Sequence, residues 1–295
     1  MEINKSITGK TKLIGLIGNP IEHTISPQLH NTISGMLDIK LTYVPFRVNP
    51  EDLEYAVKGL KALNFLGFNV TVPYKKDVMK YLDENTREAL LMGAVNTVKN
   101  IDGTLYGYNT DAEGFSRSFK EEAGTGFRDK TVLLIGAGGA ARSIAVKIAF
   151  EGAKKLYIAN RTLKKAQELA SLINENVKYL ASSLSYEDKD FFDIFYKSDI
   201  IINTTSAGMY PNISESPVDL NTCRFNSNQI VYDVIYNPLK TRFLSEAEKN
   251  GCKIINGLGM LLYQGIAAYE IWTGVKLPED FVRDLCNLFK SEFLA

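Results

Sequence analysis

The sequence predicts an α/β protein built from two sheet-containing domains, of which the second contains a doubly wound parallel sheet. Short apolar runs alternate with amphipathic stretches from one end of the chain to the other, which is the pattern of strands connected by helices. In the second half, one such run passes directly into the glycine-rich turn Gly136–Gly139, as it does where a strand of a parallel sheet enters its crossover helix. The length of 295 residues is typical of two domains, at roughly 150 residues each.

Apolar runs in the first half predict strands that are buried on both faces. The expected strands are Lys12–Ile17, Leu41–Val48, Phe65–Thr71, Ala94–Lys99 and Thr104–Tyr108. A helix is expected to begin with Ser26 as its N-cap and Pro27 at its first helical position. Further helical stretches are expected at Glu51–Leu63 and Lys76–Leu91, and another begins near Asp111.

A second unit begins at Lys130 and has the same alternating pattern. Its expected strands are Thr131–Ile135, Leu156–Ala159, Val177–Leu180, Ile200–Asn203, Ile230–Val234 and an edge strand at Ile254–Ile255, and a helix covers Ala140–Phe150. This order predicts a parallel sheet with helical crossovers. From Leu261 onward the pattern is helical, with a break at Trp272–Gly274 and a last helix that begins at Pro278.

Charge and composition exclude several classes of protein. The chain has 34 Lys and Arg against 34 Asp and Glu, so it has no overall attraction for nucleic acid or an anionic membrane. No apolar run approaches the roughly 18 residues that a membrane span needs, and the first residues do not resemble a signal peptide. Three cysteines without a C-x-x-C pair and two histidines, His23 and His30, favour neither disulfides nor a metal site. We therefore expect a metal-free protein of the reducing cytoplasm.

The glycine-rich turn predicts a Rossmann-type dinucleotide site. It follows a predicted strand and opens a predicted helix, which is the context in which G-x-G-x-x-A binds a dinucleotide. Gly136 makes the tight turn, Gly138 lets the backbone approach a pyrophosphate, and Ala141 lets the helix pack closely. The N-terminus of that helix offers N–H donors to the anion. A glycine turn with a purely structural role is the alternative.

The segment after the next strand predicts which dinucleotide is bound. An NAD site would have a carboxylate about 20 residues past the first glycine, to accept hydrogen bonds from the ribose. This chain instead has Asn160, Arg161 and Thr162, followed by Lys164 and Lys165. Cations and hydroxyls suit a 2′-phosphate, so the sequence favours NADP. The alternative, an exposed helix face, is favoured for Lys164 but not for Arg161.

Four polar segments interrupt the first half at predicted strand ends and helix starts, where α/β proteins place ligand groups. These segments are His23–Pro27, Asn69–Lys75, Ala94–Thr97 and Gly107–Asp111. Together they supply hydroxyls, amides, one ammonium and one carboxylate, which suit a small polyhydroxylated acid. The structural alternatives are helix caps for Ser26 and Asp111 and a surface position for Lys75.

These segments resemble the shikimate dehydrogenase family in nearly the whole chain. Beside the single residue Asn96, seven motifs occur in the family's order: the N-V-T-x-P-x-K signature at Asn69–Lys75, then Gly107–Asp111, Gly136–Arg142, Asn160–Thr162, Asn203–Met209, Asp233–Pro238 and Gly257–Gln264. The resemblance implies reversible, NADP-dependent reduction of 3-dehydroshikimate to shikimate in aromatic amino-acid biosynthesis. It also implies a substrate-binding domain over residues 1–111, an NADP-binding Rossmann domain over 112–258, and C-terminal helices over 259–295 that fold back on the first domain. The implied ligands are small molecules, and the chain is expected to be a monomer or a homodimer.

The resemblance also assigns roles residue by residue. Lys75 matches the family's catalytic lysine, and Asp111 matches its paired aspartate. The residues that match substrate contacts are Thr24, Ser26, Thr71, Asn96, Tyr236 and Gln264. The residues expected to contact the cofactor are Gly136, Ala137, Gly138, Gly139, Ala140, Asn160, Arg161, Thr162, Lys165, Thr204, Ser206, Met209, Val234 and Gly257.

The chemistry agrees with these roles. Hydride transfer to a ketone leaves negative charge on its oxygen, which needs a positioned proton donor. Lys75 can supply that proton, since an aspartate beside an ammonium normally stays ionised.

One residue departs from the family pattern and leaves alternatives open. Thr24 stands where the carboxylate-binding H-S-x-S-P segment usually has serine, so it keeps the hydroxyl and adds a methyl group. A quinate/shikimate dehydrogenase with broader substrate and cofactor use is the closest alternative. A catalytically silent nucleotide-dependent sensor on the same fold is another, although such a protein would not need Lys75. A methylene-tetrahydrofolate-type dehydrogenase has a related architecture but suits the polar motifs less well.

Overall fold

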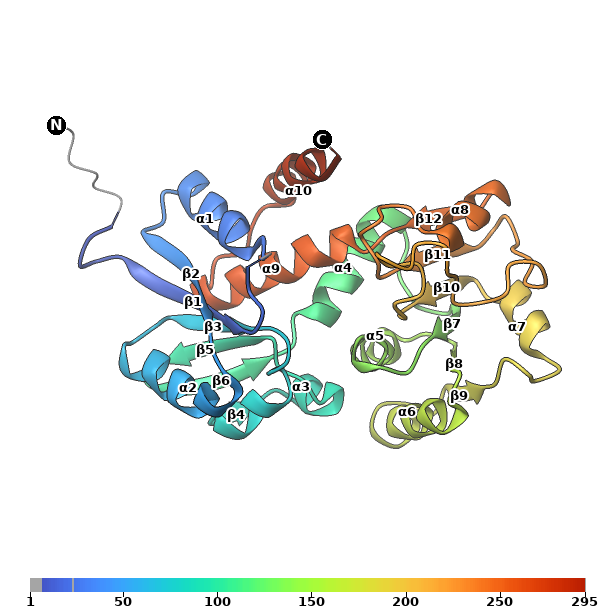
Figure 1. Cartoon of the computed structure of the whole chain (residues 1–295), viewed down its shortest axis with the longest axis horizontal. Coiled ribbons are helices and arrows are strands. Elements are labelled where there is room, and N and C mark those ends of the chain that lie inside the picture. Colours follow the sequence, from blue (N-terminus) through green and yellow to red (C-terminus); the bar gives the residue numbers. More distant parts are fainter. Residues whose placement is uncertain (1–6, 23, 295) are drawn as a thin grey trace. The chain divides into compact units, whose positions relative to one another are not determined.

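The structure is a computed structural model that describes residues 7–22 and 24–294 (Figure 1). The chain divides into two compact units, one formed by residues 1–110 with 264–295 and the other by residues 111–263. The boundaries expected from the sequence lie after residues 111 and 258, close to these positions.

The first unit contains a mixed six-stranded sheet in the order β2-β1-β3-β5-β6-β4. Its strands are β1 (Lys12–Gly18), β2 (Leu41–Arg47), β3 (Gly67–Val70), β4 (Glu84–Asn85), β5 (Thr97–Ile101) and β6 (Thr104–Tyr108). β1 runs parallel to β2 and β3, whereas β5 runs antiparallel to both β3 and β6. The β5–β6 hairpin turns at Asp102 and Gly103, both with positive φ, as a tight two-residue hairpin requires. The carboxyl ends of β1, β3 and β6 therefore meet the start of β5 at one edge of the sheet.

The helices of the first unit come from both ends of the chain. They are α1 (Ser26–Met36), η1 (Pro50–Asp52), α2 (Leu53–Ala62), η2 (Asp77–Tyr81), α3 (Arg87–Met92), the part of α9 (Leu258–Thr273) from residue 264 onward, and α10 (Glu279–Leu294). The Trp272 indole of α9 donates to the carbonyl oxygen of Val98 (2.8 Å), and the Tyr269 hydroxyl contacts that of Ser34 (3.3 Å). A Cβ on Gly67 would lie 2.4 Å from the Trp272 indole nitrogen, so glycine there lets α9 pack directly on the sheet.

Two expected elements of the first unit were wrong. The helix after the first strand has Ile25 as its N-cap, and Ser26 is already helical without capping through its side chain. The stretch Lys76–Leu91 is not one helical region, because η2 and α3 are separated by the short strand β4. β4 pairs with β6, and the Asp83 carboxylate accepts from the Leu105 amide (2.8 Å). Because of these contacts with β6, residues 84–85 join the sheet and do not continue a helix.

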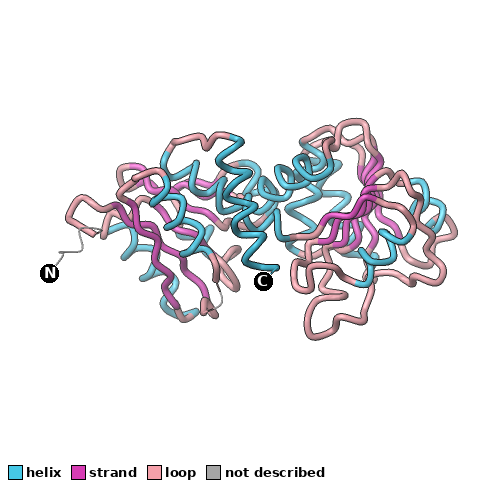
Figure 2. The backbone as a smooth tube through the Cα atoms, turned by 90° about the horizontal axis from the view of Figure 1, so that it is seen from above, coloured by secondary structure: helices cyan, strands magenta, loops and turns pink. Residues whose placement is uncertain are grey.

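The second unit is a doubly wound parallel sheet, in the order β12-β11-β10-β7-β8-β9. Its strands are β7 (Thr131–Ile135), β8 (Lys155–Ala159), β9 (Ala181–Leu184), β10 (Ile200–Asn203), β11 (Ile230–Asp233) and β12 (Lys253–Ile255), and every pairing is parallel. Its helices are α4 (Asp111–Ala123), α5 (Gly139–Phe150), α6 (Leu163–Asn176), α7 (Phe191–Lys197), α8 (Arg242–Lys249) and the first residues of α9. Figure 2 shows the strands side by side with helices on the faces of the sheet. The predicted fold class is confirmed.

One strand of this sheet lies later than the sequence pattern indicates. The strand expected at Val177–Leu180 is β9, which begins at Ala181, because α6 continues to Asn176 and Val177 is its C-cap. Asn174 accounts for the shift. Its side-chain oxygen accepts from the amides of Leu180 (3.0 Å) and Ala181 (2.8 Å), and so fixes the turn between helix and strand.

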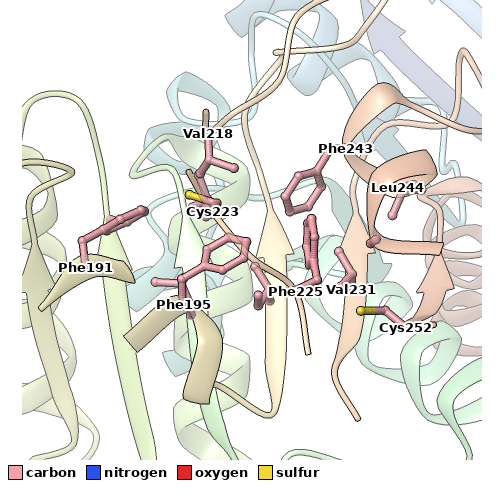
Figure 3. Packing of buried hydrophobic residues seen from close by; sticks show 14 of the residues in the cluster. Phe191, Phe195, Val218, Cys223, Phe225, Val231, Phe243, Leu244 and Cys252 are labelled. Carbon is pink, nitrogen blue, oxygen red and sulfur yellow. The ribbon is translucent and has the colours of Figure 1, made fainter. Parts of the chain in front are cut away.

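An aromatic core fills one face of the second sheet (Figure 3). Phe195, Phe225 and Phe243 pack in succession, with ring centroids 5.1 and 5.6 Å apart. Cys223 and Cys252 lie in the same cluster as free thiols, and burial raises the pKa of each to about 11. Thiols that stay protonated are poor nucleophiles, so these cysteines act as apolar core residues.

Candidate active site

A group of buried polar side chains lies at the edge of the first sheet where β3 ends and β5 begins. Polar side chains are seldom buried unless they are hydrogen-bonded, so such a group points to a site. Its members are Asn69, Asn96, Thr97, Asn109 and Thr110, each less than a tenth exposed. They come from three of the polar segments that the sequence analysis singled out.

Asn96 is the centre of this group. Its side-chain oxygen accepts from the backbone amide of Thr110 (2.7 Å), and its amide nitrogen donates to the Thr110 hydroxyl (3.0 Å). The same nitrogen reaches the side-chain oxygen of Gln264 at 3.5 Å. The predicted substrate contacts Asn96 and Gln264 are thus adjacent, although 168 positions separate them in the chain.

Backbone hydrogen bonds hold Thr71 and Lys75 beside this group. The Thr71 amide donates to the carbonyl oxygen of Ile17 (3.0 Å), and the Val70 amide donates to that of Asn96 (2.9 Å). The Val95 amide donates to the carbonyl oxygen of Lys75 (2.7 Å). The turn that carries the half-buried lysine is therefore fixed against the residue that precedes Asn96.

Thr24 and Ser26 form a second polar pair, just before and at the start of α1. The Thr24 hydroxyl accepts from the Ser26 amide (3.3 Å) and donates to the Ser26 hydroxyl (3.2 Å). Both side chains are half-buried. This turn holds two hydroxyls next to each other, as recognition of a carboxylate by two donors would need. His23 of the same motif lies outside the described residues.

The remaining predicted catalytic and substrate residues belong to the second unit. Asp111 is the first residue of α4 and follows Thr110 directly in the chain. It is half-buried, and its charge is favourable at a helix N-terminus. Tyr236 lies in the loop after β11 and is 40% exposed.

The predicted cofactor residues meet at the carboxyl edge of the parallel sheet. The amide of Gly136 donates to the carbonyl oxygen of Ala159 (2.7 Å), and the amide of Thr204 donates to that of Ile135 (2.9 Å). The amide of Gly257 donates to the carbonyl oxygen of Ile235 (3.0 Å). These bonds join the turns after β7, β8 and β10, and separately those after β11 and β12. The strand order reverses between β7 and β10, which is where such sheets bind nucleotides.

The glycine-rich turn fits a pyrophosphate. Gly136 has φ +114°, and a Cβ on it would lie 2.4 Å from the Thr204 hydroxyl, so the turn requires glycine. Nothing lies within 4 Å of a Cβ on Gly138 or Gly139, which leaves space for a ligand against the backbone. α5 begins here without a side-chain cap and without an acidic residue in its first turn. Its N-terminal N–H groups can therefore face an anion.

The turn after β8 presents the predicted phosphate-binding side chains. The Asn160 side chain donates to the carbonyl oxygen of Thr162 (2.9 Å), which fixes the turn. Arg161, Thr162 and Lys165 are all exposed. Burial raises the pKa of Tyr186 to about 12, and the positive charge of Arg161 acts to lower that pKa. Met209 and Ser206 are likewise exposed, in the loop after β10.

A buried carboxylate that the sequence analysis did not single out as a site residue holds this edge together. Asp233 ends β11 and is fully buried. It accepts hydrogen bonds from the side chains of Asn203 (3.0 Å) and Thr241 (2.7 Å). The side-chain oxygen of Asn203 in turn accepts from the Thr205 amide (2.9 Å), so Asp233 supports the loop expected to contact the cofactor. The motif Asp233–Pro238 was visible in the sequence, but its partners are 30 residues before it and 8 after it.

Replacing Asp233 by asparagine should remove a pH-dependent cost to stability. Burial raises the pKa of Asp233 from 3.8 to about 6, although its three hydrogen bonds act to lower it. The folded state therefore holds this proton more tightly than the unfolded state, and the carboxyl's contribution to stability falls as pH rises from about 4 through 6. The wild type should lose about 2 kcal/mol relative to Asp233→Asn between pH 4 and 7. Urea titrations of both proteins at several pH values measure this, and a pH-independent difference would contradict it.

Neither metal chemistry nor a membrane span is suggested by the described residues. Over residues 7–22 and 24–294, no three His, Cys, Asp or Glu side chains are grouped so that they could hold a metal ion. Within the same part of the chain, no helix is long and apolar enough to cross a bilayer.

Comparison with known proteins places the chain in a family. It matches three family descriptions in succession: "Shikimate dehydrogenase substrate binding domain" over residues 16–98, "Shikimate / quinate 5-dehydrogenase" over 119–234, and "Shikimate 5'-dehydrogenase C-terminal domain" over 257–286. The chain belongs to the shikimate dehydrogenase family. The resemblance found in the sequence motifs is confirmed.

Individual members of the family are similar over nearly their whole length. The NADP(+)-dependent shikimate dehydrogenase of Caldanaerobacter subterraneus is 48% identical over 94% of this chain and 96% of its own. The solved structure of shikimate 5-dehydrogenase from Listeria monocytogenes, in complex with shikimate and NAD, is 39% identical with a TM-score of 0.89 and covers 96% and 99% of the two chains. The structure of quinate dehydrogenase from Corynebacterium glutamicum, in complex with NAD, is 29% identical with a TM-score of 0.85 and covers 95% and 99%.

Proposed function

We propose that this chain is an NADP-dependent shikimate dehydrogenase, which reduces 3-dehydroshikimate to shikimate reversibly in aromatic amino-acid biosynthesis. The observation that carries the proposal is its likeness to relatives of that name, at 41–48% identity over most of the chain. Two properties of the structure support it. One sheet edge gathers hydroxyl and amide groups next to the turn that carries a half-buried lysine, and the other sheet provides a glycine-rich turn that fits a dinucleotide.

The substrate groups divide by chemistry. Thr24 and Ser26 are proposed to bind the carboxylate, because the two adjacent hydroxyls can both donate to it when the Thr24 hydroxyl turns its proton from Ser26 to the ligand. Asn96, Thr71 and Gln264 are proposed to bind the ring hydroxyls. The amide of Asn96 is already fixed by Thr110, so little of its side-chain freedom remains to be lost when substrate binds. Tyr236 is proposed as a further contact.

The reaction needs a proton donor on the protein. NADPH, when bound, supplies the hydride. Lys75 is proposed to donate a proton to the carbonyl oxygen that becomes the alcohol, and to accept it in the reverse direction. Asp111 is proposed as its catalytic partner. This pair is the feature that a catalytically silent sensor would not need.

The cofactor is proposed to lie along the carboxyl edge of the parallel sheet. The backbone of Gly136–Ala140 would hold the pyrophosphate, with the N–H groups at the start of α5 facing it. Asn160, Arg161, Thr162 and Lys165 would hold the 2′-phosphate. Thr204, Ser206, Met209, Val234 and Gly257 would line the nicotinamide end. We further propose a cytoplasmic location, which the three free thiols suit, and a monomeric or homodimeric state.

A four-way assay tests the proposed function. Oxidation of shikimate and of quinate is measured with NADP and with NAD, by the absorbance of the reduced nicotinamide. We expect the highest kcat/KM for shikimate with NADP. An equal kcat/KM for quinate would instead indicate a quinate/shikimate dehydrogenase with broader substrate use. The similarity to the Corynebacterium quinate dehydrogenase makes this the second candidate. No turnover with any combination would favour the sensor.

Thr24 should contribute to the choice between shikimate and quinate. Quinate carries an extra hydroxyl on the carbon that bears the carboxylate, near the proposed position of the Thr24 methyl. The Thr24 oxygen accepts from the Ser26 amide, which holds the threonine side chain, so the methyl cannot turn away freely. A misplaced methyl costs about 10- to 200-fold in kcat/KM. We therefore expect Thr24→Ser to raise kcat/KM for quinate by about tenfold or more and to leave that for shikimate within about twofold. An equal change on both substrates would show that the methyl does not discriminate between them.

A further inference from the structure

A chain of buried hydrogen bonds runs from Tyr43 in β2 to the centre of the polar group. The Tyr43 hydroxyl donates to the side-chain oxygen of Asn69 (2.8 Å). The Asn69 amide nitrogen then donates to the carbonyl oxygen of Asn96 (2.9 Å) and to the Thr97 hydroxyl (3.0 Å). Tyr43 is 2% exposed and Asn69 is 6% exposed. Because Asn96 is a proposed substrate contact, this series of buried hydrogen bonds leads to the proposed substrate site.

The chain of hydrogen bonds continues to the Asn96 side chain. The Thr97 hydroxyl lies 3.2 Å from the Asn96 side-chain oxygen and 3.0 Å from the Thr110 hydroxyl. Asn96 reaches Gln264 on its other side. The hydrogen bonds therefore connect the Tyr43 hydroxyl, through Asn69 and Thr97, to the Asn96 side chain. Buried networks of this kind act as a unit.

Tyr43 is itself held rigidly by two consecutive residues of α1. Asn31 accepts from the Tyr43 amide (2.8 Å) and donates to the Tyr43 carbonyl oxygen (3.2 Å). The His30 ring stacks on the Tyr43 ring, with centroids 4.4 Å apart and planes 20° apart. Burial lowers the pKa of His30 to about 3, so this surface is uncharged near neutral pH. With backbone and ring both fixed, the phenol oxygen has a single position.

We propose that Tyr43 is a positioning residue for substrate recognition, which acts through Asn69 to hold the Asn96 backbone, and with it the Asn96 amide, in place. The inference rests on the proposed function for the identity of the substrate. A phenylalanine would fill the same space in the core, so the hydroxyl is the part of the residue that needs a function. Without it, the buried Asn69 oxygen loses its donor, and the side chain that donates to the Asn96 carbonyl oxygen and to the Thr97 hydroxyl is no longer anchored on its other side.

The test is the variant Tyr43→Phe, with Tyr269→Phe as matched control. Tyr269 is also fully buried in the first unit, but its hydroxyl contacts Ser34, which is not part of the polar group. We expect Tyr43→Phe to raise the KM for shikimate about tenfold, as the loss of one oriented hydrogen bond predicts. kcat and the KM for NADP should stay within about twofold, because an interaction made equally in ground and transition states affects KM alone. Tyr269→Phe should leave all three constants near wild type.

A double-mutant cycle separates positioning from a general structural effect. If Tyr43 acts through Asn96, Tyr43→Phe should lower kcat/KM for shikimate in the wild type and have little further effect in an Asn96→Ala background. Thermal melting of each variant checks that it is folded. An unchanged KM in Tyr43→Phe, or an effect fully additive with Asn96→Ala, would overturn the positioning role. Absence of shikimate turnover in the wild type would instead overturn the proposed function, so the two failures are distinguishable.

Discussion

Replacing Lys75 by alanine should lower kcat for shikimate oxidation by about 10²–10⁴-fold, which is the usual contribution of a positioned general acid or base. The fold should survive, since Lys75 is anchored through its backbone carbonyl, which accepts from Val95. The preceding residue, Tyr74, is held by its own hydroxyl, which donates to the carbonyl oxygen of Val48 (2.6 Å). Steady-state kinetics and a thermal melt of the purified variant measure both expectations.

The neighbouring lysine provides a matched control for this experiment. Lys76 is exposed and carries the same charge, so Lys76→Ala should keep kcat within about twofold. Asp111→Asn should also reduce turnover, and the double variant with Lys75→Ala should lose less than the product of the two single effects, because paired groups act as a unit. A Lys75→Ala protein with near-native kcat would refute the proton-transfer role.

The second large effect is expected at Arg161, through the cofactor. Arg161→Ala should raise the KM for NADP by about 10- to 100-fold, since hydrogen bonds to a charged group contribute about 1.5–3 kcal/mol. The KM for NAD should change by less than about twofold, because NAD has no 2′-phosphate. The side chain is exposed, and the Asn160–Thr162 hydrogen bond shapes its turn independently, so the truncation should leave the turn intact. Fluorescence titration with NADPH and NADH provides a second measurement.

Lys164 is the control for the phosphate assignment. It is exposed in the first turn of α6, and Lys164→Ala removes a nearby cation of the same sign. We expect a change of less than about threefold in the KM for NADP, as a screened surface charge predicts. If Arg161→Ala weakens both dinucleotides equally, Arg161 contacts the adenosine or supports the loop, and the phosphate assignment is wrong.

The sequence predicted the second unit well because its strands are buried on both faces. The run at Thr131–Ile135 has nearly every residue buried, so its apolar composition identifies it without knowledge of its partners. β9 has only Ala181 and Leu184 buried, and its place at the sheet edge is fixed by Asn174. Periodicity cannot detect such a strand, because a side chain from the preceding helix decides where it starts.

Site residues that follow strand ends could be predicted from the sequence. Buried polar residues that pair with distant parts of the chain could not. Asn96 and Arg161 belong to polar segments that stand out in the sequence. Tyr43 does not, because it lies within a strand and its side-chain partner Asn69 is 26 residues away. Asp233 belongs to a motif that stands out, but its supporting role depends on Asn203, 30 residues before it. A single hydroxyl or carboxylate within an apolar run has no periodic signature. Its importance emerges only when the partners are placed.

The two hydrogen bonds between Asn31 and Tyr43 have a second consequence, for association between chains. β2 is the edge strand of its sheet, and unpaired backbone groups on such a strand are a template on which another chain can add a strand. Asn31 occupies the amide and carbonyl of Tyr43, and Pro45, two residues further along, has no N–H to offer. A strand that approaches this edge therefore cannot form regular backbone hydrogen bonds at Tyr43 or at the amide of Pro45. The same side chain that steadies Tyr43 thus also protects the sheet against edge-to-edge aggregation.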